Sequence, residues 1–181
     1  MKMQFPNMSY KEKAIDYINE FHEYNSAVNG SGGLNNYLKN STYEEWLVKI
    51  RSDIDIANIE KPRVPSLTYF YVREEDDKIV GMINIRLALN DFLRNVGGHI
   101  GYSIRPTERR KHYGTGMLKE ALKVCEAIGI DNVIVSCDKV NAASAGVIRN
   151  CGGILDSEFY SETFGEVIQR YIIKTNGGDR P

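Results

Sequence analysis

The stretch HIGYSIRPTERRKHYGTGMLKEALKVCEAIG, residues 99–129, contains an apparent strand, a basic turn and an amphipathic pattern in direct succession. The strand pattern stops at Pro106, which cannot donate a ladder hydrogen bond. From Met117 onward the apolar residues recur at helical spacing, and Gly129 is a favourable C-terminal residue for a helix. The run NVIVSC, residues 132–137, is almost continuously apolar, which is typical of a strand covered on both faces. Strand, helix and strand in this order predict a right-handed parallel crossover.

The elements around this crossover predict antiparallel pairing. Two helices come first, each opened by a predicted capping box, Ser9 with Glu12 and Ser41 with Glu44. The other predicted elements are a strand hairpin at 67–72 and 79–89, a short helix at 142–150, and two strands at 154–161 and 166–174. The predicted fold class is therefore α/β, a mixed sheet with helices on both faces.

Length and charge restrict the function. A chain of 181 residues fits one domain, which we place at 1–175, and the polar end at 176–181 is predicted to be a frayed tail. Lys plus Arg number 23 and Asp plus Glu 24, so the net charge is -1. Nucleic acid and anionic membranes are not expected as partners, because binding them needs a surplus of basic residues. Any anion site must be local.

The cysteines and the N-terminal sequence indicate an intracellular protein. Cys125, Cys137 and Cys151 are odd in number and form no CxxC pair, so neither a disulfide framework nor a metal site is expected. Cys125 and Cys151 are interpreted as small core residues. The segment MKMQFPNMSYKEK has no apolar run typical of a signal peptide, and no stretch reaches the length of a membrane span. We expect a cytoplasmic location.

The turn at Arg109–Gly114 is the first candidate site. It lies where a helix starts, and the first N–H groups of a helix have no intrahelical acceptor and carry partial positive charge. Basic side chains strengthen such an anion site, and Gly114 lets an anion approach the backbone. The alternative is a solvated basic turn that binds nothing.

This stretch, with NVIVSCDKVNAASAGVIRNCGG after it, resembles the central half of a GNAT-superfamily N-acetyltransferase. The signature loop of that family, Arg/Gln-x-x-Gly-x-Gly/Ala, falls on Arg109 to Gly114, with His112 in place of the first glycine. A second register, Lys111 to Gly116, restores both glycines but starts with Lys and shortens the helix, so the first is preferred. The similarity covers about residues 67–174, and the chain most resembles an uncharacterised branch of predicted acetyltransferases that share GGHIGYSIRP.

The resemblance implies a GNAT fold, in which the mostly antiparallel central sheet is splayed at a parallel strand pair, and acetyl-CoA as cosubstrate. The diphosphate would lie against the amides of about Arg110 to Thr115, and the pantetheine arm beside Tyr102 to Ile104. His112 could narrow the loop with its Cβ or reach a phosphate with its imidazole. Asn141 could cap its helix or contact pantetheine. The implied cofactor-binding residues are Ser103, Ile104, Arg109, Arg110, Lys111, His112, Tyr113, Gly114, Thr115 and Asn141.

Acetyl transfer needs a base for the amine and an acid for the leaving thiolate. His99 is the candidate base, since imidazole titrates in the right range; the alternative is a buried structural histidine bonded to backbone. The tyrosine that serves as acid in the family is replaced here by Ile148. Tyr102 or Tyr113 could replace it, or the thiolate could leave to solvent. Backbone N–H groups near Ser103 and Ile104 could polarise the thioester oxygen.

The acceptor pocket is expected between the first two helices, their Gly-rich connection Val28 to Leu34, and the strand that bears Asn84 and Arg86. Arg86 could bind an acceptor carboxylate, or it could be a surface arginine on an alternating strand.

Three functions are compatible with these features. The first is an N-acetyltransferase that moves an acetyl group from acetyl-CoA directly to a primary amine of a small molecule or peptide, without metal. The second is a non-catalytic acyl-CoA-binding or sensor domain, and the third is a phosphate-binding α/β domain with a nucleotide ligand. A homodimer is one option for the assembly.

Overall fold

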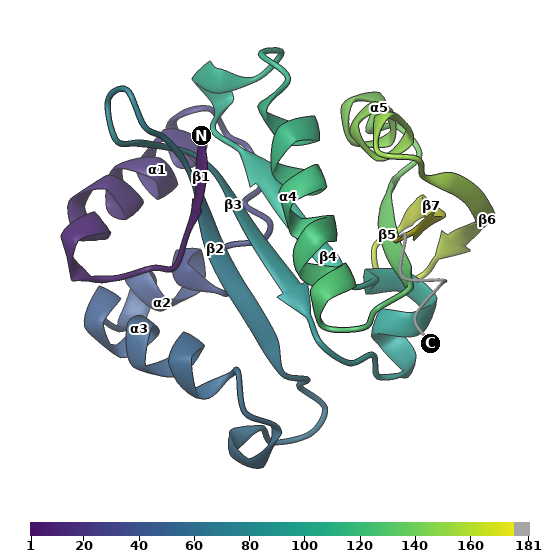
Figure 1. Ribbon diagram of the computed structural model, residues 1–181, viewed down its shortest axis with the longest axis horizontal. Coiled ribbons are helices and arrows are strands. Elements are labelled where there is room, and N and C mark those ends of the chain that lie inside the picture. Colours follow the sequence, from purple (N-terminus) through teal and green to yellow (C-terminus); the bar gives the residue numbers. More distant parts are fainter. Residues whose placement is uncertain (176–181) are drawn as a thin grey trace.

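The computed structural model describes residues 1–175, which form two sheets that meet at one pair of strands (Figure 1). The predicted frayed tail, 176–181, lies outside the described residues. In the first sheet the strand order is β1-β2-β3-β4, and in the second it is β5-β7-β6, with every ladder antiparallel. The strands are β1 Lys2–Gln4, β2 Ser66–Arg73, β3 Lys78–Arg86, β4 Ile100–Ile104, β5 Asn132–Asp138, β6 Ile154–Ser161 and β7 Glu166–Lys174.

The helices cover both faces of the first sheet. Their bounds are α1 Lys11–Glu23, α2 Leu34–Asn40, α3 Tyr43–Ser52, α4 Tyr113–Ala127 and α5 Ala142–Asn150. One buried cluster joins α1, α2 and α3 to β2 and β3, with Tyr17, Trp46 and Phe70 among its largest members. A second cluster lies on the other face, where α4 packs against the strands. The predicted fold class is therefore confirmed.

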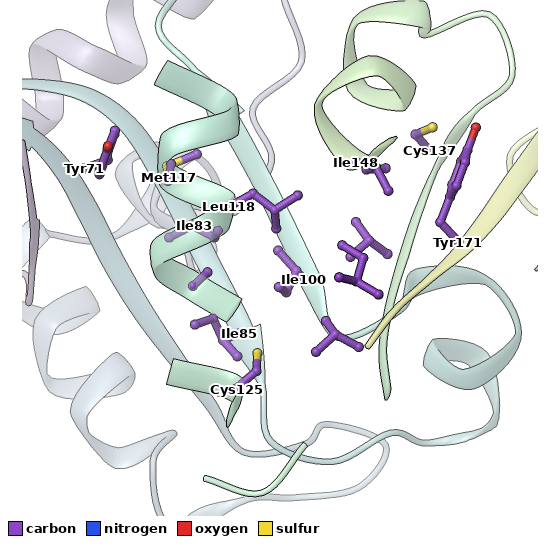
Figure 2. Packing of buried hydrophobic residues seen from close by; sticks show 14 of the residues in the cluster. Tyr71, Ile83, Ile85, Ile100, Met117, Leu118, Cys125, Cys137, Ile148 and Tyr171 are labelled. Atoms are coloured by element: carbon purple, nitrogen blue, oxygen red, sulfur yellow. The ribbon is translucent and has the colours of Figure 1, made fainter. Parts of the chain in front are cut away.

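The second cluster also connects the two sheets. Figure 2 shows Met117, Leu118 and Cys125 of α4 among the labelled core residues of the first sheet, with Cys137 and Tyr171 of the second sheet farther along. Cys125 is fully buried, in agreement with its interpretation as a core residue. The apolar stripe of α4 thus fixes the helix over the place where the sheets meet.

The two sheets are joined by a short contact between β4 and β5. The backbone N–H of His99 donates to the carbonyl oxygen of Ile134 (2.7 Å), and the N–H of Ile134 donates to Nδ1 of His99 (2.9 Å). Beyond this contact both strands lead toward one cavity, which Ile104 of β4 and Asp138 of β5 line. The strands therefore run in the same direction and diverge, as expected for a splayed parallel pair.

Both predicted capping boxes are wrong in detail. The box at α3 is formed one residue later, by Thr42 and Glu45, because Ser41 is still the C-terminal cap of α2. At the first helix the cap is Asn7, whose side-chain oxygen accepts from the N–H of Ser9 and opens a 3-10 turn before α1.

Candidate active site

The diverging ends of β4 and β5 enclose a cavity of about 670 Å³, which we call the large cavity. The segment before α4, the start of α5 and the connection after α1 complete its walls. All of the implied cofactor-binding residues except Lys111 line it: Ser103, Ile104, Arg109, Arg110, His112, Tyr113, Gly114, Thr115 and Asn141. Residues that are scattered over the middle of the chain therefore surround a single space.

The turn before α4 has the backbone of an anion site. Arg110 and His112 both have a φ of 61°, and His112 is the N-cap of α4 with no side-chain capping hydrogen bond. The first turn of α4 contains no acidic residue. Its first N–H groups are thus left without an intrahelical acceptor at the wall of the large cavity. A left-handed residue at position 112 explains why the family motif has glycine there and favours the first register.

The basic side chains of this turn divide into two groups. Arg109 donates to the carbonyl oxygen of Ile104 (3.2 Å) and to the Ser26 hydroxyl (2.7 Å), so it fixes the turn to β4 and to the segment after α1. Lys111 pairs with the buried carboxylate of Glu108 (2.8 Å). Arg110 and His112 are exposed. The guanidinium of Arg110 and the ring nitrogens of His112 are therefore available to a bound anion.

Glu108 connects the turn to β2 and β3 through ion pairs. Its carboxylate also pairs with Arg73 (3.0 Å) and Lys78 (3.1 Å). Burial raises the pKa of Glu108, but the hydrogen bonds from Lys111, Lys78 and Arg73 outweigh it and leave the pKa at about 2. The carboxylate therefore remains charged and anchors the turn at neutral pH.

The edge of β4 that faces the large cavity has main-chain groups that β3 does not use, one of which, the carbonyl of Ile104, accepts from Arg109. On the other edge, the carbonyl of His99 accepts from Arg86 N–H and Arg105 N–H donates to the carbonyl of Val80. Because backbone groups alternate in direction along a strand, the odd-numbered residues between them bond to β3. Those of Tyr102 and Ile104 point into the gap between the sheets.

Two hydroxyl groups meet at the inner end of the large cavity. The Tyr102 Oη lies 2.9 Å from the Oγ of Ser144, and both residues line the cavity. Burial raises the pKa of Tyr102 to about 12, although the hydrogen bond with Ser144 lowers it. Tyr102 is thus protonated at neutral pH and can donate to an anion.

Tyr113 is placed differently. Its hydroxyl accepts from Nη1 of Arg73 (3.3 Å), within the cluster around Glu108. Tyr113 lines the large cavity, but its hydroxyl is committed to this cluster and does not join the Tyr102–Ser144 pair. Asn141 caps α5, because its Oδ1 accepts from the N–H of Ser144 (3.0 Å).

His99 lies at the contact between the sheets and is buried. Since Nδ1 accepts from the N–H of Ile134, the ring proton is left on Nε2 and neither nitrogen offers a free lone pair. Burial, together with Arg86 and Arg94, lowers the pKa of His99 to about 4. His99 is also absent from the residues that line the large cavity. This geometry matches the structural alternative, and we do not retain His99 as the base.

Two further cavities open from the same place. The inner cavity, about 390 Å³, shares Ala27, Asn29, Tyr102, Asp138, Asn141 and Ser144 with the large cavity. The outer cavity, about 480 Å³, is lined by the Gly-rich connection 28–33 and by β3, and it shares Asn29, Arg86 and Phe92 with the inner one. The three cavities are therefore contiguous, and Asn29 lines all of them.

The two predicted acceptor residues lie in these cavities. Asn84 lines the outer cavity, and its side-chain N–H groups contact the hydroxyls of Ser66 (3.1 Å) and Thr68 (3.0 Å). Arg86 lines both, and its Nη1 donates to the carbonyls of Gly97 and Gly98, each at 2.9 Å. Arg86 is thus a half-buried residue of a pocket wall, with its guanidinium bonded to two backbone carbonyls.

The sequence reasoning missed Ser144 and Asp138. Ser144 follows Asn141, the cap of α5, by three residues. This spacing was the only feature of the sequence that could have pointed to Ser144 as a site residue. Asp138 is the last residue of β5 and lines both the large and the inner cavity.

Within residues 1–175, no group of three or more His, Cys, Asp or Glu side chains could hold a metal ion. Over the same residues, none of the helices combines the length and apolar character needed to span a bilayer.

Comparison with known proteins places these features in a family. A family model described as an acetyltransferase (GNAT) domain matches residues 16–154. No curated protein sequence is significantly similar to this chain.

Several solved structures share the fold. The ribosomal-protein-S5-alanine acetyltransferase from Vibrio fischeri has a TM-score of 0.68 at 14% identity, over 98% of this chain and 94% of that one. The ribosomal L7/L12 α-N-protein acetyltransferase RimL, in complex with coenzyme A, has 0.67 at 12% identity, over 97% and 94%. The microcin C7 self-immunity acetyltransferase MccE, in complex with acetyl-CoA and AMP, has 0.64 at 16% identity, over 95% and 91%.

The family model spans most of the chain, including the turn before α4 and the strands β4 and β5 on either side of the large cavity. The chain belongs to the GNAT acetyltransferases.

Proposed function

We propose that this protein is an N-acetyltransferase that moves an acetyl group from acetyl-CoA directly to a primary amine. The observation that carries the proposal is the continuity of the large cavity, which runs from the free N–H groups of α4 along the open edge of β4 to the Tyr102–Ser144 hydroxyls. These groups suit a diphosphate, an amide-containing arm and a leaving thiolate in that order.

Acetyl-CoA, when bound, would supply the acetyl group as a thioester. The N–H groups at about Arg110 to Thr115 would bind the diphosphate, with Arg110 adding charge from the solvent side. The main-chain groups of Tyr102 and Ile104 would pair with the pantetheine amides. Such contacts are made by the backbone, so they tolerate His112 in the loop.

The chemistry would take place where the large and inner cavities join. Asp138 is the carboxylate at this junction, and we assign it the role of general base, directly or through one water, for the acceptor ammonium. Tyr102, bonded to Ser144, would give a proton to the departing sulfur. The ammonium loses one proton to Asp138, and the amine then attacks so that the new C–N bond replaces the C–S bond. The second proton leaves the nitrogen as the amide forms and restores the Tyr102 hydroxyl, so the thiol leaves neutral.

Calorimetry with acetyl-CoA, CoA and ATP, together with thiol release in the presence of a panel of primary amines, tests the proposal. We expect micromolar binding of both CoA ligands, weaker binding of ATP, and thiol release that depends on an amine. Binding without thiol release for any amine would favour the acyl-CoA-binding alternative, and preferential binding of ATP would favour a nucleotide domain.

A matched pair of charge variants tests the diphosphate site. Arg110→Glu places a carboxylate beside the helix start and should weaken CoA binding about tenfold, the scale of one charge-assisted contact. Lys123→Glu makes the same charge change on an exposed residue of the same helix, in the turn that contains Glu120, and should leave binding unchanged. Equal effects would indicate general electrostatics and contradict a localised site.

Two further assignments belong to this proposal, namely a cytoplasmic location and a homodimer. Size-exclusion chromatography with light scattering measures the assembly.

A further inference from the structure

Of the residues in 1–175 that line the inner cavity, two are charged, and their charges are opposite. Arg86 comes from β3 and Asp138 from the end of β5. Asp138 lies at the junction with the large cavity, whereas Arg86 lies at the junction with the outer one. A ligand in this cavity therefore meets a carboxylate near the Tyr102–Ser144 hydroxyls and a guanidinium farther away.

Arg86 has no acidic partner in residues 1–175. Its Nη1 is used by the carbonyls of Gly97 and Gly98, while Nε and Nη2 donate to no acceptor in the described part of the chain. Burial lowers the pKa of Arg86. The Nη2 atom lies 3.4 Å from the position that a Cβ on Gly101 would take, so Gly101 leaves this edge of the guanidinium uncovered. A half-buried guanidinium with a free edge matches a carboxylate in geometry as well as charge.

Asp138 is likewise without an ion-pair partner in residues 1–175, since the neighbouring Lys139 pairs with Glu158 instead (2.5 Å). The Oγ of Ser136, two residues earlier on the same face of β5, is buried and has no hydrogen-bond partner among the described residues. A buried hydroxyl without a partner has a free-energy cost that a polar ligand would remove.

The inner cavity also has an apolar part, beside the polar side chains of Asn29 and Asn141. The rings of Phe92 and Phe164 lie 6.1 Å apart, centroid to centroid, and both line it together with Val96, Ile100 and Ile168. A volume of about 390 Å³ fits a molecule of amino-acid size and is closed to a folded protein domain.

We infer that the acceptor is a small amino carboxylate, an amino acid with a free α-amine and an apolar side chain. Its ammonium would lie at Asp138, its carboxylate at the free edge of Arg86, and its side chain against Phe92 and Phe164. An amine without a carboxylate leaves the Arg86 charge unpaired, and a polyamine adds a second positive charge beside it. This inference rests on the proposed function and narrows its acceptor.

The test compares each acid with its amide, which differ only in the group that Arg86 would bind. We expect kcat/KM for L-leucine and L-phenylalanine to exceed that for leucinamide and phenylalaninamide by about tenfold to a hundredfold, the range for one charged contact. Spermidine should be poorer than either acid. Equal use of acid and amide by the unmodified protein would overturn the inference.

Arg86→Met distinguishes binding of the acceptor carboxylate from support of the backbone at Gly97 and Gly98. Loss of the bonds to Gly97 and Gly98 would lower turnover of acid and amide alike, whereas loss of a carboxylate contact lowers only the acid, so the ratio should fall to within about threefold of one. Arg94→Met removes a nearby exposed arginine that lines none of the three cavities and should leave the ratio unchanged. An unchanged ratio in Arg86→Met would contradict the assignment.

A binding measurement keeps this inference separate from the proposed function. In the presence of CoA, calorimetry should show N-acetyl-leucine binding at least tenfold more tightly than N-acetyl-leucinamide. If no amine is acetylated but N-acetyl-leucine still binds more tightly than its amide, the enzyme assignment fails, whereas the assignment of an amino carboxylate as ligand is supported. If transfer occurs without the preference, the ligand class fails alone.

Discussion

Replacing His99 by Asn should separate a structural histidine from a catalytic one. The Asn side-chain oxygen can take the place of Nδ1 as acceptor for the N–H of Ile134, but it does not titrate. Burial, with Arg86 and Arg94, lowers the pKa of His99 from 6.5 to about 4. The folded protein therefore binds fewer protons than the unfolded chain between these two pH values, and stability rises with pH through this window.

The size of this effect follows from the pKa difference. At 1.36 kcal/mol for each pKa unit, His99 contributes roughly 3 kcal/mol to the free energy of unfolding above pH 6.5, and this is lost as the pH falls toward 4. His99→Asn should lack this pH dependence. Urea unfolding of both proteins between pH 4.5 and 7.5 measures it, and the variant should be relatively more stable at the acidic end.

Activity provides the second half of the test. With the hydrogen bond to Ile134 retained, His99→Asn should keep acetyl transfer within about threefold at pH 8. His99→Ala leaves the N–H of Ile134 without an acceptor and should lose about 1–3 kcal/mol of stability. A fully folded His99→Asn that loses transfer a hundredfold or more would refute the structural assignment and restore the imidazole as base.

Three other variants test the site. His112→Gly should keep or improve CoA affinity. It should stabilise the protein by less than about 1 kcal/mol, because relief of the left-handed strain at φ 61° only slightly exceeds the entropy that glycine adds to the unfolded chain. A tenfold weaker CoA affinity by calorimetry would show that the imidazole binds phosphate. Tyr102→Phe should lower kcat roughly a hundredfold with little change in KM for acetyl-CoA, and adding Ser144→Ala should lower it little further, since the hydroxyls act as a pair; additive losses in steady-state kinetics would contradict the pair. Gly30→Ala puts a Cβ 2.4 Å from the carbonyl oxygen of Gly101 at a φ of 74° and should cost about 2–3 kcal/mol in urea unfolding, so unchanged stability would be inconsistent with this packing.

Elements with a strong local pattern were predictable from the sequence. The bounds predicted for α5, β6 and β7 agree with the structure, because Asn141 precedes α5, Gly152 and Gly153 separate α5 from β6, and Gly165 precedes β7. The strand β1 was not predicted, since its three residues are a strand only through pairing with β2, about 70 positions away. The helix α2 was hidden by the glycines before it and by the polar run LNNYLKN.

The same distinction holds for the site. The turn before α4 was found because its backbone, charges and helix start are contiguous in the chain. The role of His99 depends on Ile134, and that of Tyr102 on Ser144, so neither could be read from neighbouring residues. Arg86 was offered as a residue of the acceptor pocket and lines two of the cavities, but its free edge follows from a glycine on β4 and was not predictable.

The open edge of β4 also bears on how such proteins diverge. Every residue type except proline presents the same amide and carbonyl there, so the side chain of Ile104 can change without removing what a pantetheine arm would need. Ligand recognition of this kind imposes little constraint on residue identity, and identities of 12–16% at TM-scores of 0.64–0.68 are what such weak constraint allows. Under the proposed function, changes of acceptor can then evolve at the inner cavity while the large cavity keeps its backbone groups.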